Sequence, residues 1–150
     1  MTPQELKQLI QSDPEATQLI EQGNDWECAA RCSEIAPAKN IPSPLTIMGI
    51  LNLYQDNLGL GAFVIATIKQ VAQVNPVIGE MVPFMGPSTQ QDARPDFGLP
   101  AIRQALVTPV ELGGIGLTQE QAGPILRAGE TKQTITALEV EQVRIQLWHS

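Results

Sequence analysis

The residues that could carry out chemistry are few, and the most suggestive pair is Cys28 and Cys32. Because they are four positions apart, a helix would place both thiols on one face. A zinc site needs about four Cys, His or carboxylate ligands, and the only histidine, His149, is the penultimate residue. A redox pair is more naturally spaced Cys-x-x-Cys. Three interpretations remain open, a metal site, a redox pair and two small buried side chains beside Trp26, and the pattern favours the third.

A second group of reactive side chains, Asp92, Arg94 and Asp96, lies in one Pro/Gly-rich segment. Two carboxylates could act as the acid and base of a hydrolase, but short acid-base-acid runs are typical of a solvated surface. The serines have no nearby histidine to activate them. The glycines of segment 113–116 lack the Lys-Ser/Thr ending of a phosphate loop. We therefore expect a protein that is not an enzyme, with no metal and no cofactor, and keep a small hydrolase as the least favoured alternative.

Composition limits the partners that the chain could bind. Charged residues make up 17% of the 150 residues, below the ~25% of an average soluble domain, and the formal net charge is −7. This acidity argues against binding a nucleic-acid backbone. The longest uncharged runs, 41–55 and 57–68, are too short and too polar for a membrane-spanning helix, and the N-terminus shows no secretory signal. We expect a protein that is made in the cytosol and binds other proteins, with no direct nucleic-acid or membrane partner.

The distribution of charge is more informative than its amount. Between Ile41 and Gly79 only Asp56 and Lys69 are charged among 39 residues. So few charges predict a segment that is covered, either in the core of the protein or against a partner.

Helix starts are the clearest local signals. A threonine followed three residues later by Glu or Gln, with apolar residues on both sides, is typical of a capping box at a helix N-terminus. The chain has three, which begin at Thr2, Thr118 and Thr136. Proline is favoured at the first helical position, so Asp13-Pro14 and Ser43-Pro44 predict two more starts.

These signals predict an all-α fold: one domain, 1–150, of seven to nine short helices around a central apolar pair, 44–55 and 60–74. We expect short N-terminal helices in 1–35, apolar central helices in 44–85, an exposed loop at 86–98 and C-terminal helices in 99–150. The Pro/Gly-rich loops are predicted at 36–44, 86–98 and 108–117.

Apolar residues near the expected loops are candidates for a protein interface. Met81, Phe84, Met85 and Phe97 bracket segment 86–98, where they could enter a groove of a partner or close the core under the loop. The pair Leu147 and Trp148 could likewise pack internally or anchor into a neighbouring subunit. The sequence leaves both interpretations open for all six.

The two ends of the chain carry a family resemblance. The run from Leu6 to Pro14, followed by Gly23-Asn24-Asp25, resembles the start of small proteins encoded among bacteriophage virion-assembly genes. Segments 116–130 and 135–144 are similar in style to the C-terminal parts of such proteins. The resemblance implies a non-enzymatic virion component of the head, neck or tail, which leaves the host cytoplasm for a symmetric assembly with copies of itself and other structural proteins. It assigns no functional residue. The alternative is a cytosolic helical adaptor or regulator that binds one protein partner as a monomer.

Overall fold

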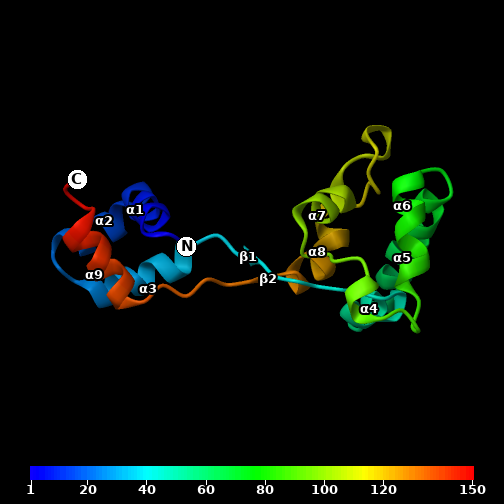
Figure 1. Ribbon diagram of the computed structural model, residues 1–150, viewed down its shortest axis with the longest axis horizontal. Coiled ribbons are helices and arrows are strands. Elements are labelled where there is room, and N and C mark those ends of the chain that lie inside the picture. The colour runs from blue at the N-terminus through cyan, green and yellow to red at the C-terminus, as the bar shows by residue number, and fades with distance from the viewer. The chain divides into compact units, whose positions relative to one another are not determined.

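The protein is helical along most of its length (Figure 1). A computed structural model describes all residues, 1–150, and shows nine α-helices, three short 3-10 helices and two strands of two residues each. The all-α class predicted from the sequence is confirmed.

The chain divides into two compact units, whereas the sequence predicts one domain. Unit 1 comprises residues 1–39 and 132–150, and unit 2 comprises residues 40–131. The buried apolar side chains form two separate clusters, one in each unit, so no single pair of helices is central to the whole chain. The strands β1 (Lys39–Asn40) and β2 (Glu130–Thr131), where the chain passes from one unit to the other, form a two-stranded sheet.

Unit 1 is built from both ends of the chain. It contains α1 (Pro3–Ser12), α2 (Pro14–Glu21), α3 (Asp25–Ile35) and α9 (Ala137–Gln146). Figure 1 shows these four helices together, and α9 packs against both α1 and α3. The side chains of its core come from all four helices and from the segment before α9: Leu6, Ile10, Ala16, Ile20, Cys28, Ala29, Cys32, Ile135, Val140 and Val143.

The predicted helix starts are confirmed at four of five places. Thr2, Thr118 and Thr136 are the N-caps of α1, α8 (Gln119–Ala128) and α9, each with the reciprocal hydrogen bonds of a capping box. Asp13 is the N-cap of α2, and its carboxylate accepts a hydrogen bond from the backbone N of Ala16 at 3.0 Å. The caps satisfy donors that the first turn of a helix leaves free, a local requirement that neighbouring residues can meet.

The fifth start, at Ser43-Pro44, is wrong. In unit 2 the helix α4 (Ile47–Leu53) begins three residues later, with Thr46 as its N-cap. The backbone at Ser43 and Pro44 is instead extended against residues 96 and 97, where the N of Phe97 donates to the Ser43 carbonyl at 2.9 Å. This pairing leaves no helical conformation for the Ser43-Pro44 step.

The same pairing corrects the prediction that 86–98 is an exposed loop throughout. Its first part is exposed and includes the 3-10 helix η2 (Gln91–Ala93), but Phe97 and Gly98 are buried. The Asp96 carboxylate accepts hydrogen bonds from the backbone N atoms of Ser43 at 2.7 Å and Gly98 at 2.8 Å. The contacts with Ser43 and Pro44, which are far away in the sequence, give the second part of the segment a buried, ordered path.

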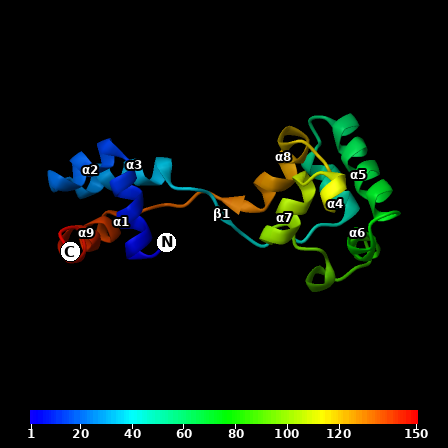
Figure 2. The ribbon, with the colours of Figure 1, turned by 90° about the horizontal axis from the view of Figure 1, so that it is seen from above.

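The remaining helices of unit 2 are α5 (Leu58–Ala72), α6 (Pro76–Met81), α7 (Pro100–Val107) and α8, with the 3-10 helices η1 (Val82–Met85) and η3 (Val110–Leu112). Helix α5 packs against α4, α6 and α8. In both views it lies at an edge of the unit, with α7 and α8 on one side of it (Figure 2). The sequence predicts a central place for this helix, and in the structure its buried side is part of the core of unit 2 while its other side is left uncovered. No helix in either unit combines the length and apolarity needed to span a membrane.

Candidate interaction surfaces

The two cysteines are part of the packing of unit 1. Cys28 and Cys32 are fully buried and unbridged, and the Cys28 thiol donates to the carbonyl of Ala16 at 3.5 Å. The hydrogen bond with the Cys32 thiol, together with burial, raises the pKa of Cys28. Since the thiolate is the reactive form, this site opposes nucleophilic chemistry at Cys28. The predicted burial of both thiols is confirmed, but Trp26 does not cover them, because its side chain is 81% exposed.

The two carboxylates of segment 86–98 line one surface hollow but differ in exposure and in hydrogen bonding. Asp92 is exposed, whereas Asp96 holds two backbone N–H groups, as described above. Arg94 donates from Nε to the carbonyl of Thr89 at 3.0 Å. A surface hollow of about 360 Å³ lies among these three side chains and Pro42, Pro44 and Gln91. In this arrangement Asp96 joins two backbone segments, a structural task that the sequence pattern did not reveal. Nowhere in the chain do three His, Cys, Asp or Glu side chains form a cluster that could hold a metal ion.

The six predicted interface residues do not form one surface. Met85 and Phe97 are fully buried in the core of unit 2, which corrects the expectation that they reach a partner. Their side chains close the core under the loop, the alternative that the sequence left open. Met81 is half-buried against the same core, and Phe84 remains 49% exposed.

The other two predicted residues lie in unit 1, at the end of α9. Leu147 and Trp148 are half-buried, and Trp148 packs against the core of this unit. The internal packing considered for Trp148 is thus the arrangement that the structure shows.

A broad exposed face of α5 was not predicted as a site. The buried positions of this helix are Gly61, Val64, Ile68 and Val71, which lie on one side of it. The opposite side is exposed and carries small, apolar or neutral residues with one charge: Gly59, Ala62, Phe63, Ala66, Lys69, Gln70, Gln73 and Val74. We call this set the α5 face. The Phe63 side chain is 51% exposed, and Val77 at the start of α6 is also exposed.

A second apolar surface is a groove in unit 1, which we call the Trp26 groove. It has a volume of about 540 Å³ and is lined by Trp26, Ala29 and Ala30 of α3 and by residues 134–138 at the start of α9. Sequence reasoning missed it. The signal was present, because a helix with Cys28 and Cys32 on its buried side turns Trp26 away from that side.

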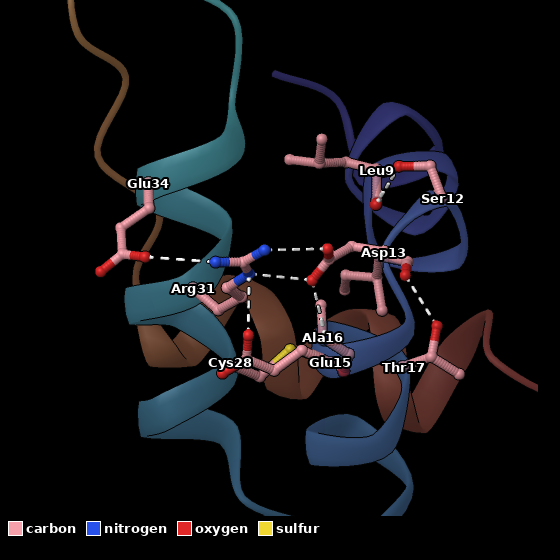
Figure 3. A network of polar contacts seen from close by, with 10 residues as sticks. Leu9, Ser12, Asp13, Glu15, Ala16, Thr17, Cys28, Arg31 and Glu34 are labelled. Carbon is pink, nitrogen blue, oxygen red and sulfur yellow. Dashed lines mark hydrogen bonds and ion pairs between the residues drawn. The ribbon is translucent and has the colours of Figure 1, made fainter.

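The two helices that line this groove, α3 and α9, also carry ion pairs, none of whose residues lines the groove. Arg31 contacts the carboxylates of Asp13, Glu15 and Glu34 at 3.0, 3.4 and 3.5 Å, a cluster shown in Figure 3. On the other helix of the pair, Arg144 contacts Asp25 at 3.0 Å. Both guanidinium groups are therefore already occupied by acidic side chains of unit 1.

Comparisons with known proteins identify no relative: no family model, no curated protein and no solved structure matches this chain.

Proposed function

We propose that this protein is a non-enzymatic assembly protein that acts through protein contacts, and that copies of the chain associate through the α5 face. The observation that carries the proposal is the exposure of this face. It belongs to the charge-poor segment between Ile41 and Gly79, which predicts a covered surface, yet the fold covers one side of α5 only.

The chemistry of the α5 face suits a contact between identical subunits. Its single charged residue is Lys69, so two copies can approach without bringing carboxylates together. Gly59, Ala62 and Ala66 are small enough for another backbone to come close, and Phe63 supplies a large apolar side chain. Repetition of one such contact is the ordinary basis of symmetric assemblies.

We propose, more specifically, that the protein is a bacteriophage virion component. This assignment is supported by the resemblance of the two chain ends to small proteins encoded among virion-assembly genes. The acidic composition agrees with a role that does not involve nucleic-acid contact.

Sedimentation of the purified protein over a range of concentrations tests the contact. We expect the wild type to associate and Ala66→Glu to remain monomeric, because burying a carboxylate in the middle of the α5 face costs more than its pairing with Lys69, three residues later, returns. Glutamate is a good helix former, so the helix itself should persist. The matched control is Ala101→Glu, an exposed alanine of the same unit on α7, a helix whose main contacts are with α8.

Three outcomes would contradict the proposal. A wild type that stays monomeric at the highest soluble concentration argues against self-association, and a one-to-one complex with a cytosolic protein would favour an adaptor. If Ala66→Glu and Ala101→Glu reduced association equally, the reduction would be due to the added charge and not to its position on the α5 face. Electron microscopy of the assembled state, or co-purification with phage structural proteins, tests the virion assignment.

A further inference from the structure

We infer that the Trp26 groove of unit 1 binds an apolar segment with lysine or arginine side chains beside it, contributed by a different protein. The inference shares with the proposed function the assumption that the chain works by contact. The proposed function concerns the α5 face of unit 2, whereas this inference concerns the Trp26 groove of unit 1. Either can therefore be disproved without the other.

The groove has the composition of a binding site for apolar side chains. All its lining residues are apolar or threonine, and its volume of about 540 Å³ lies within the range of ligand-binding pockets. Trp26 leaves 81% of its side chain in solvent on a well-formed helix. Tryptophan is among the residue types most enriched at positions that dominate binding energy, so an exposed tryptophan beside an apolar groove is a candidate anchor for a partner.

The surroundings of the groove are acidic. Glu27 and Glu34 are neighbours of Ala30 on the surface of α3, at three and four residues, and Glu141 follows Leu138 by three residues on α9. Of these three carboxylates, Glu34 contacts Arg31 at 3.5 Å, whereas Glu27 and Glu141 form no ion pair. Unit 1 as a whole has nine Asp and Glu against five Lys and Arg.

This charge distribution selects the kind of partner. Lys132, two residues before the lining residue Thr134, is the nearest cation in the sequence without a carboxylate partner, and it does not balance the surplus. A second copy that docked groove to groove would bring these carboxylates together, which opposes self-association at this site. A cationic segment would gain attraction at the rim and apolar contact in the groove.

The test uses two synthetic peptides of about four helical turns, with the same leucine positions and with either lysine or glutamate elsewhere. Trp26 is the reporter, in full-length protein that carries Trp148→Phe so that only one tryptophan emits. We expect the lysine peptide to shift the emission of Trp26 to shorter wavelength. The glutamate peptide should bind at least about tenfold more weakly. Binding of the lysine peptide should weaken as salt is raised, since charges at the rim of an interface are screened.

A matched pair of variants locates the site. Leu138 and Ile145 are both on α9 and both 65% exposed, but only Leu138 lines the groove. Leu138→Ser should weaken binding of the lysine peptide about tenfold or more, and Ile145→Ser should not. Charge reversal with Glu27→Lys and Glu141→Lys should shift the preference toward the glutamate peptide.

Four results would overturn the inference: no change in Trp26 emission with the lysine peptide, equal affinity for the two peptides, equal effects of the two serine variants, or a dimer of the wild type that Leu138→Ser dissociates. The last would identify a second copy as the occupant. None of these results bears on Ala66→Glu, so they leave the proposed role of the α5 face to its own experiment.

Discussion

Arg31 and Asp13 form a two-pronged ion pair, in which Nε lies 3.0 Å from Oδ2 and Nη2 lies 3.1 Å from Oδ1 (Figure 3). The same Oδ2 accepts the hydrogen bond from the backbone N of Ala16 at 3.0 Å. One carboxylate thus caps the start of α2 and ties this helix to α3. The Arg31 hydrogen bonds, followed by that of Ala16, lower the pKa of Asp13 below its usual value of 3.8.

This shift predicts how the stability of unit 1 depends on pH. Because the folded state holds the proton of Asp13 less tightly than the unfolded state does, Asp13 stabilises the fold above a pH of about 4, and this contribution is lost as the pH falls through the folded pKa. Asp13→Asn keeps an oxygen for Ala16 but removes the charge. We expect it to lower the urea midpoint at neutral pH and to flatten the loss of stability on acidification. Glu21→Gln, an exposed carboxylate without an ion pair, is the control. Parallel pH curves for wild type and Asp13→Asn would contradict the assignment.

Two glycines of unit 2 should respond to alanine in opposite directions. A Cβ at Gly98 would collide with the backbone carbonyl oxygen of Ile41, which cannot move aside cheaply, so Gly98→Ala should lower the free energy of unfolding by about 1–3 kcal/mol or more. At Gly59, in the first turn of α5, the nearest atom to such a Cβ would be Oδ1 of Asn57 at 3.7 Å. Gly59→Ala should therefore stabilise by about 0.4–1 kcal/mol. Urea unfolding measures both, and a Gly98→Ala protein as stable as wild type would show that segments 41–45 and 95–98 are not tightly paired.

Unit 1 should fold without unit 2. Its core contains side chains from unit 1 only, and the Gln133 side chain donates from Nε2 to the carbonyl of Pro37 at 2.8 Å, so the two cut ends lie close together. We expect a chain in which a short glycine linker replaces residues 40–131 to be helical and to unfold cooperatively by circular dichroism. Its stability should be low, since about 60 residues bury little surface. Ile10→Ala should then lower it by about 2–5 kcal/mol, enough to abolish the transition. A deletion protein with no cooperative transition would mean that unit 1 needs unit 2.

The thiols should be inert in the folded protein. Cys28 and Cys32 are fully buried, and the pKa of Cys28 is raised by its hydrogen bond with Cys32 and by burial. We expect an aromatic disulfide reagent to label neither residue in native buffer and both in urea, with a rate that follows unfolding. Fast labelling of either thiol in native buffer would show that α3 opens locally.

The features that were predicted correctly from the sequence are mostly those that depend on residues close together in the chain. The starts of α1, α2, α8 and α9 need only a capping side chain and a backbone donor three residues away, so the residues themselves specify them. The predicted start at Ser43-Pro44 shows the limit of such signals. Its proline satisfies the local rule, but the bridge between Pro44 and Asp96 and the hydrogen bond from the Phe97 backbone N to the Ser43 carbonyl impose an extended conformation.

The candidate interaction surfaces could likewise be predicted only in part from the sequence. A poverty of charge between Ile41 and Gly79 is visible in the sequence and indicates contact, but which side of α5 the fold covers depends on α4, α6 and α8. For Met85 and Phe97 the sequence leaves open whether they contact a partner or close the core under the loop, and in the structure they are core residues.

The sequence by itself determined the helical class, the local helix starts and the acidic, charge-poor character of the chain, because these follow from composition and from interactions within a single turn. Only the tertiary structure decided that there are two cores, that Trp26 is exposed beside an apolar groove and that α5 has an open face. These features depend on which distant segments pack together, as α9 does with α1 and α3. The gain from such packing is summed over many weak contacts and is not encoded in any short motif.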